Sequence, residues 1–376
     1  MRFRRSAPRA LIVVAALVIA VLTFAANRLF GGMTSAVEQS QVELMRSIIA
    51  FNLEGAAANA LARAEMTASD PLVRELLARQ DRAGLLAHTQ AMFNEQRDKY
   101  GVDQAQFHLA PATSFLRLQS PALFGDDLSR FRPIVVAVNR ERVARKGVAL
   151  ARTGPGVFGV APIRDMAGNH VGSVEFGMDF GALLDRLKAA YGLELTLFID
   201  EAPLRAYANG MPPGAITEQN RLGTTVRLHS TNWTLMRDLV NADDLRVHDE
   251  PRDWVRDAGG VPYGVVLYPL RSGSGEVLGA IAVARSFAPT RGAAGRTDVL
   301  QWLFALLGFL VLAGAAVIVI RGWLVRPLEA ITGRFATIGD GERPEPDPDD
   351  RFLAEEMKAL AAEHERLAEL VEAKRT

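Results

Sequence analysis

Two long apolar runs, one near each end of the sequence, constrain the chain most strongly. The first extends from Ala10 to about Phe30 and the second from Val299 to Ile320. An α-helix needs about 20 predominantly apolar residues to cross the hydrocarbon core of a membrane. The sequence therefore predicts two transmembrane helices, over residues 10–30 and 299–320.

Basic residues flank the outer end of each run: four arginines lie within residues 1–9, and Arg321 and Arg326 follow the second run. The positive-inside rule then places segments 1–9 and 321–376 in the cytoplasm and residues 31–298 outside the cytoplasmic membrane. A cleaved signal peptide is the alternative for the first run, although no small-x-small cleavage site follows it. A buried core helix is the alternative for the second.

The composition excludes several kinds of site. Lys and Arg together number 43, as do Asp and Glu, so the formal net charge of zero argues against a nucleic-acid partner. Cysteine is absent, which excludes disulfides, thiolate metal sites and cysteine nucleophiles. We expect no cofactor, no metal site and no catalytic residue.

The outer region begins with a helical pattern. Val37, Leu44, Ile48 and Phe51 share one face of a long helix predicted over 31–69. This face either packs against a sheet or forms the interface of a dimer. Ser69-Asp70-Pro71 then reads as the N-terminal cap of a further helix.

Strand-like patterns with turn residues between them dominate after Tyr100. We expect the pair Asp126-Asp127 to cap a helix and Pro133 to lie in the first turn of a helix that ends near Val143. The predicted strands are 104–109, 114–118, 147–152, 158–164, 170–180, 193–200, 224–228 and 231–239.

A weak internal repeat relates residues 156–180 to residues 261–287. Each copy has a strand that contains proline, a turn that contains glycine, and a second strand that begins with a Val-Gly or Leu-Gly step. The repeat predicts an α+β fold with two stacked antiparallel-sheet modules, over 70–188 and 189–288, and a linker over 289–298. Chance similarity of two hairpins is the alternative.

The stretch from Phe107 to Arg140, followed by Gly147 and residues 156–180, resembles the Cache modules of methyl-accepting chemotaxis proteins. Over residues 35–288 the chain resembles the double Cache sensor of bacterial chemoreceptors, histidine kinases and cyclases. The resemblance implies two PAS-like modules and a small-molecule pocket in the first, membrane-distal module. It also implies a sensor that signals across the membrane, as in chemotaxis, and we expect it to act as a homodimer.

The segment after the second apolar run resembles the start of a HAMP domain. Pro327 begins a helix, and Leu328, Ile331 and Ile338 give it an apolar stripe, so we expect these four residues to transmit the signal. Two such helices from each chain of a parallel dimer form a four-helix coiled coil. The family's second-helix signature is absent, and the output domain or downstream cytoplasmic partner is left open.

Ligand recognition needs fixed polar groups among apolar walls. The candidate side chains are His108, Arg117, Arg132, Arg152 and Glu175. Arginine offers a planar fork to carboxylate or phosphate, so the ligand is expected to be a small molecule of anionic character. Arg117 is the strongest candidate because it lies between Leu116 and Leu118. A solvated sheet face is the alternative for all five.

Two other chemistries have weaker support. His108, Ser114 and Asp126 could form a hydrolase triad, but no Gly-x-Ser-x-Gly elbow surrounds the serine. His108, Asp126, Asp127 and His170 could gather around a metal ion. A different rival function is an extracytoplasmic module that binds a partner protein or an envelope polymer, for which a first-module cavity filled by apolar side chains is expected.

Overall fold

The computed structural model describes residues 2–212, 214–246 and 249–321, together with six single positions beyond them (326, 362, 363, 366, 369 and 373). The signal-transmitting candidates Pro327, Leu328, Ile331 and Ile338 lie outside the described residues. The chain divides into two compact units. One contains Ala36–Thr290, and the other contains Met1–Ser35 with Arg291–Thr376.

The larger unit contains two antiparallel sheets, one after the other along the chain. The first sheet has the strand order β2-β1-β5-β4-β3 and the second has the order β7-β8-β6-β11-β10-β9. The first-sheet strands are β1 (Val102–Leu109), β2 (Thr113–Arg117), β3 (Arg145–Ala151), β4 (Gly154–Arg164) and β5 (His170–Asp179). The second-sheet strands are β6 (Glu194–Asp200), β7 (Arg221–Leu222), β8 (Thr225–Ser230), β9 (Arg252–Ala258), β10 (Val261–Arg271) and β11 (Val277–Ser286).

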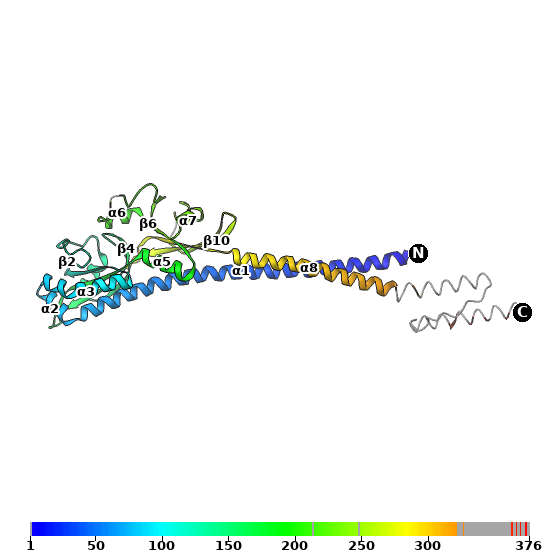
Figure 1. Ribbon diagram of the computed structural model, residues 1–376, viewed down its shortest axis with the longest axis horizontal. Helices are drawn as coiled ribbons and strands as arrows, with labels where there is room; N and C mark the ends of the chain where they lie inside the picture. The colour runs from blue at the N-terminus through cyan, green and yellow to red at the C-terminus, as the bar shows by residue number, and fades with distance from the viewer. Residues whose placement is uncertain are drawn as a thin grey trace. The chain divides into compact units, whose positions relative to one another are not determined.

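Helix α1 (Arg2–Ser69) runs alongside both sheets in the larger unit (Figure 1). Its buried face is rich in alanine, which lets a helix approach a sheet closely. The closest approach is at Gly159 of β4, where an added Cβ would lie 2.0 Å from the backbone nitrogen of Leu61. The packing of α1 on the sheet therefore requires glycine at this position.

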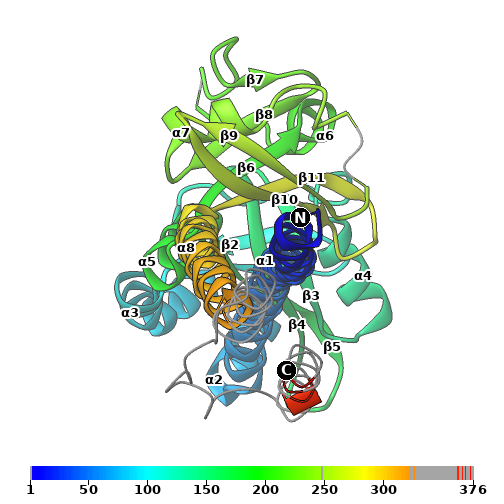
Figure 2. The ribbon, with the colours of Figure 1, turned by 90° about the vertical axis from the view of Figure 1, so that its right-hand side faces the viewer.

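Helices α2 (Pro71–Ala78) and α3 (Arg82–Tyr100) follow α1. The predicted cap is confirmed, since the Asp70 carboxylate accepts hydrogen bonds from the backbone N–H groups of Leu72 and Val73 and Pro71 occupies the first turn. Figure 2 shows α3 and α4 (Pro133–Glu141) on opposite sides of the first sheet. Its two faces are therefore covered by different elements: α1 and α3 on one, and α4 on the other.

The internal repeat is confirmed and extends beyond the hairpins. Pro162 pairs with Ser173 in the β4–β5 hairpin, and Pro269 pairs with Ala280 in the β10–β11 hairpin. Leaving out the short β7, both sheets place their elements in the same order, so that β6, β8, β9, β10 and β11 correspond to β1, β2, β3, β4 and β5. The predicted α+β class with two antiparallel sheets is confirmed.

One strand prediction is wrong. Residues Trp233–Leu239 form helix α7 rather than a strand, because the Asn232 side chain accepts a hydrogen bond from the Leu235 amide and caps the helix start. Trp233, Met236 and Leu239 recur every three residues, and the last two are buried. Helix α7 is the second-sheet counterpart of α4. The edge strand β9 and the short helix α6 (Glu201–Tyr207) were not predicted.

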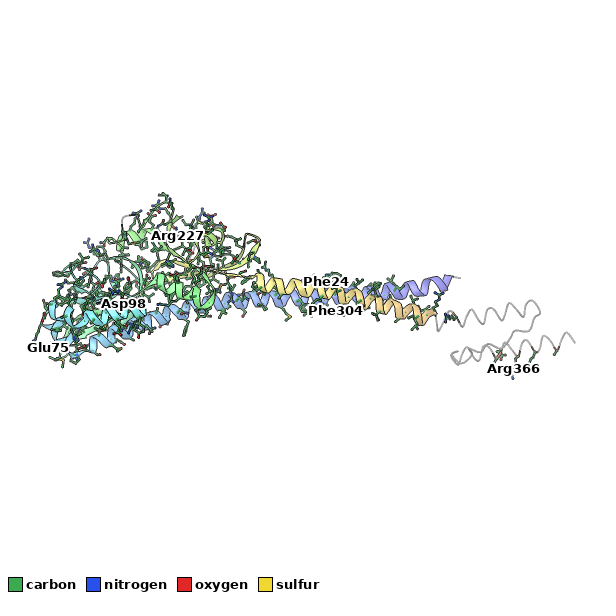
Figure 3. The ribbon with its side chains drawn as sticks, viewed as in Figure 1. Phe24, Glu75, Asp98, Arg227, Phe304 and Arg366 are labelled. Carbon is green, nitrogen blue, oxygen red and sulfur yellow. The ribbon has the colours of Figure 1, made fainter. Side chains whose placement is uncertain are left out.

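Helices α5 (Phe180–Tyr191) and α8 (Ala288–Val319) complete the described elements. The segment expected as a linker, 289–298, lies inside α8. The first part of α1 and the later part of α8 are long and apolar enough to cross a membrane. Large apolar side chains such as Phe24 and Phe304 project from these segments and are exposed (Figure 3).

Candidate ligand-binding site

One face of the first sheet carries buried polar side chains. Gln104, Gln106 and His108 alternate along β1, and Ser173 and Glu175 lie on the adjacent β5. Gln106 pairs with Glu175 and His108 pairs with Ser173 across these two strands, so the five side chains share a face. All five are buried, so this face of the sheet is not solvated. Of the five candidate side chains, His108, Arg117, Arg132 and Glu175 are likewise buried, whereas Arg152 is exposed.

Helix α4 and the chain that leads into it cover this face. Leu128, Ile134, Val135 and Val138 pack against Val160 of β4 and fill one part of the space. The rest is a cavity of about 410 Å³, which lies within the range of small-molecule sites. Its polar lining includes Gln104, Gln106, Arg117, Gln119, Asp126, Arg132, Arg152, Glu175, Tyr207 and Asn209.

Arg132 and Glu175 form an ion pair at the floor of the cavity. Only 4% of Arg132 and 1% of Glu175 is exposed. The guanidinium also donates a hydrogen bond of 3.0 Å to the Leu150 carbonyl and stacks 4.2 Å from the ring centre of Phe158. A buried charge must have its partners in place, so these contacts fix the position of Arg132.

Arg117 and Asp126 form a second ion pair at the cavity wall. Arg117 donates two parallel hydrogen bonds to the two carboxylate oxygens, at 2.8 and 2.7 Å, and a third of 3.0 Å to the Leu123 carbonyl. Hydrogen bonding to Arg117 holds the pKa of Asp126 below its usual value. The pair ties the loop after β2 to the sheet.

The prediction that Asp126 and Asp127 cap a helix is wrong. Asp126 faces Arg117 instead, and Asp127 accepts hydrogen bonds from the amide and hydroxyl of Ser129 in a local turn. The following helix starts later, at Pro133, without a side-chain cap. Short polar residues favour turns and caps alike, so the local sequence did not distinguish them.

His108 lies fully buried beside the cavity rather than in its lining. Its Nδ1 lies 3.1 Å from the Ser173 hydroxyl, whereas its Nε2 has no hydrogen-bond partner. Burial lowers the pKa of His108 to about 4, so the imidazole is neutral at pH 7. Four of the five candidates therefore line the cavity, and His108 is buried next to it without lining it.

The geometry does not assemble the alternative chemistries. The Ser114 hydroxyl accepts a hydrogen bond from Gln106, and the carboxylate of Asp126 is bound by Arg117, so neither is placed to work with His108. Within residues 2–321, leaving out the three masked positions, and at the six single positions beyond them, no three His, Asp or Glu side chains gather to hold a metal ion.

Sequence reasoning missed a wall of the cavity that comes from the second sheet. Tyr207 ends α6, and Asn209 and Gly210 follow it, yet all three line the first-sheet cavity beside the exposed Arg152. The Gly210 amide donates a hydrogen bond of 3.0 Å to the Arg152 carbonyl. No local pattern marks this segment, because its role depends on how the two sheets meet.

Comparison with known proteins relates the chain to sensory domains. The family described as "Double sensory domain of two-component sensor kinase" matches residues 39–287. No curated protein matches the sequence.

Solved structures are similar at low identity. The sensor domain of the Vibrio cholerae histidine kinase DctB is 11% identical, with a TM-score of 0.40, and the match covers 68% of this chain and 98% of that one. The ligand-binding domain of the Pseudomonas fluorescens chemoreceptor CtaA, in complex with L-serine, is 12% identical, with a TM-score of 0.38 and coverages of 67% and 98%.

An extracellular ligand binding receptor from Desulfohalobium retbaense DSM5692 is also 12% identical, with a TM-score of 0.32 and a match over 67% of this chain. This chain spans only 39% of the length of that receptor. The family match covers both sheets and most of α1 beside them, and the chain belongs to the double Cache family of sensory domains.

Proposed function

We propose that the chain is a two-pass membrane sensor that binds a small polar ligand in the first-sheet cavity. Segments 10–30 and 299–320 cross the inner membrane, both termini lie in the cytoplasm, and residues 31–298 lie outside. The two apolar helices that flank the sensory domain support this topology. Ligand binding biases the HAMP-like segment 321–376 through the second span.

The single observation that carries the proposal is a difference between corresponding faces of the two sheets. Where the first sheet has His108 paired with Ser173, the second has Phe198 paired with Ala280. On the second sheet this face is filled by Phe198, Met236, Leu239, Val265 and Leu267. The same architecture therefore has a polar cavity in one copy and a packed core in the other, which supports a ligand site in the first.

The charges in the cavity lining indicate the kind of ligand. Arg117 and Arg132 are each neutralised by a carboxylate of the lining. Among the described residues Arg152 makes no direct ion pair, although its charge contributes to the lowered pKa of Asp126 in the same lining. An anionic group of the ligand would therefore meet Arg152, while amide groups such as Gln104 and Asn209 would hydrogen-bond the rest of the molecule.

The exposed face of α1 supports a parallel homodimer. Val37, Leu44, Phe51 and Ala58 recur at intervals of seven residues, and all four are exposed. Seven-residue spacing is typical of helices that pair in a coiled coil. Ile48, expected on the same face, is buried instead. A second copy of the chain would cover the stripe and bring two ligand sites into one assembly.

A thermal-shift screen of residues 34–290 tests the proposal. The panel contains amino acids, small carboxylates and other polar metabolites. A ligand at 100 times its dissociation constant should stabilise the fold by about 2.7 kcal/mol, which raises Tm by several degrees. Stabilisation that Arg152→Ala removes would support the cavity as the site. A well-folded domain that no compound stabilises would favour the rival, a module that binds a partner protein or an envelope polymer.

A further inference from the structure

Strand β3 forms an edge of the first sheet, and two of its carbonyls and one just past its end bind groups outside that sheet's strands. Val148 accepts a hydrogen bond from the Gly273 amide at 3.2 Å, and Arg152, just past the strand end, accepts one from the Gly210 amide at 3.0 Å. Between them, Leu150 accepts a hydrogen bond from Arg132 Nη1 at 3.0 Å. These residues are two apart, so their carbonyls point the same way along one edge.

The three donors come from different parts of the molecule. Arg132 belongs to the cavity floor and is held by Glu175. Gly210 lies in the second-sheet segment that lines the cavity, and Gly273 lies in the turn between β10 and β11. One edge strand therefore contacts the cavity and two separate segments of the second sheet.

At Gly147 and Gly273, β3 and the turn between β10 and β11 meet with no side chain between them, whereas the Arg152 side chain lies against Gly210. Val148 and Ser272 form a parallel bridge. Gly147 has φ +146°, and an added Cβ there would lie 3.4 Å from the Gly273 Cα. At the other end, a Cβ on Gly210 would lie 2.4 Å from Arg152 Cγ. A shift of β3 would therefore act directly on the second-sheet backbone.

The β10–β11 hairpin connects this contact to the start of α8. The two strands pair from Tyr263–Ser286 to Arg271–Val277, next to the turn. Phe287 follows β11, is buried, and donates its amide to the Pro262 carbonyl at 2.8 Å. In the first turn of α8, Thr290 accepts a hydrogen bond of 3.2 Å from Gln41 of α1. A paired hairpin is stiff, so movement at its turn reaches its other end.

We propose that the outer edge of β3 is the joint that couples ligand occupancy of the first-sheet cavity to the second sheet, with Arg132 as its positioning residue. A ligand that changes how Arg132 holds the Leu150 carbonyl shifts β3 and with it the contacts to Gly210 and Gly273. A neighbouring cavity of about 200 Å³, between α4, β3 and the β10–β11 turn, leaves room for this movement. The proposal rests on the proposed function for its ligand.

Hydrogen–deuterium exchange of the full chain in lipid nanodiscs, without any ligand, tests the joint. The variant Arg132→Met with Glu175→Leu removes the guanidinium together with its buried partner, so that no unpaired charge remains. The matched control is Arg117→Met with Asp126→Leu, which removes the other ion pair of the cavity, whose hydrogen bonds lie within the loop after β2 and not on the carbonyls of β3. Exchange is normalised to peptides from the centre of the second sheet, such as β6.

We expect peptides containing Gly210 and Gly273 to exchange at least about tenfold faster in the Arg132 variant and to stay unchanged in the control. Arg132→Lys keeps the positive charge beside Glu175 but lacks the second guanidinium nitrogen, so its exchange should lie between the wild type and the Arg132 variant. Unchanged exchange at both glycines, or an equal change in the control, would overturn the proposal.

A second variant changes the contact between β3 and the β10–β11 turn, and it tests the joint even if the first variant does not fold. Gly147→Val pushes the β10–β11 turn away and should speed exchange in the cavity segment 120–132. Gly168→Val is the control, because Gly168 also has a positive φ, +89°, but has open space around it. Equal exchange in segment 120–132 for the two variants would contradict the joint. Neither arm uses a ligand, so these results stand apart from the outcome of the thermal-shift screen.

Discussion

Arg117 and Asp126 face each other across two parallel hydrogen bonds of 2.8 and 2.7 Å. Only 7% of the arginine side chain is exposed, against 40% of the aspartate side chain. The pair therefore joins a buried strand residue to a loop at the mouth of the cavity. The geometry of this loop depends on a contact that spans nine residues of sequence.

We predict that Arg117→Ala abolishes the ligand-dependent rise in Tm. Without the guanidinium, the loop after β2 loses the hydrogen bonds to Asp126 and Leu123 that hold it over the cavity. Thermal shift with a compound found in the screen measures the effect. Arg130→Ala is the matched control, because Arg130 is exposed on the same loop and does not line the cavity. Equal responses from the two variants would contradict a site role for Arg117.

The sequence predicted those features of the fold and the site that depend on residues close together in the chain. The local pattern predicted a strand over 104–109, where β1 lies, and the apolar neighbours of Arg117 singled out this residue. Sequence-based prediction failed for residues whose interaction partner lies far away in the chain. Asp126 was assigned to a helix cap because Arg117 is invisible to a local pattern, and Asn209 was missed because it reaches the cavity from the second sheet.

The misassigned segment Trp233–Leu239 illustrates a related limit. A short apolar run of this length fits a buried strand and a short helix equally well. The helix wins because Asn232 caps it and because Met236 and Leu239 pack over the second sheet, where α4 lies over the first. The tertiary setting decides the element type here.

The buried ion pair gives a stability prediction. Arg132→Met leaves the Glu175 carboxylate without its cation in the interior, and we expect the free energy of unfolding to fall by about 3–5 kcal/mol. Adding Glu175→Leu should restore most of the loss, since an apolar pair needs no compensation. Urea unfolding of the single and double variants measures both values. A double variant less stable than the single one would count against this account of the pair.

His108 gives a pH prediction. Its pKa is about 4 in the folded protein, against 6.5 for an ordinary histidine, so the unfolded chain binds more protons between these two values. The stability that neutral, buried His108 contributes is therefore fully present above pH 6.5. As the pH drops to 4, the free energy of unfolding should fall by about 3 kcal/mol. His108→Gln should flatten the profile in this window. Burial also lowers the pKa of His170, but this group is present in both proteins and cancels in the comparison. Parallel profiles would rule out the assignment to His108.

The exposed stripe on α1 gives the last prediction, on the dimer. Leu44 is 49% exposed at the centre of the stripe, and Val255 on β9 is 48% exposed outside it. Leu44→Glu places a charge where a second copy of α1 would pack, so we expect dimerisation of residues 34–290 to weaken at least tenfold, whereas Val255→Glu should leave it unchanged. Sedimentation velocity over a range of protein concentrations measures both dissociation constants. Because the two residues are equally exposed in one chain, a general effect of added charge would change both variants alike, and only pairing through α1 predicts a difference between them.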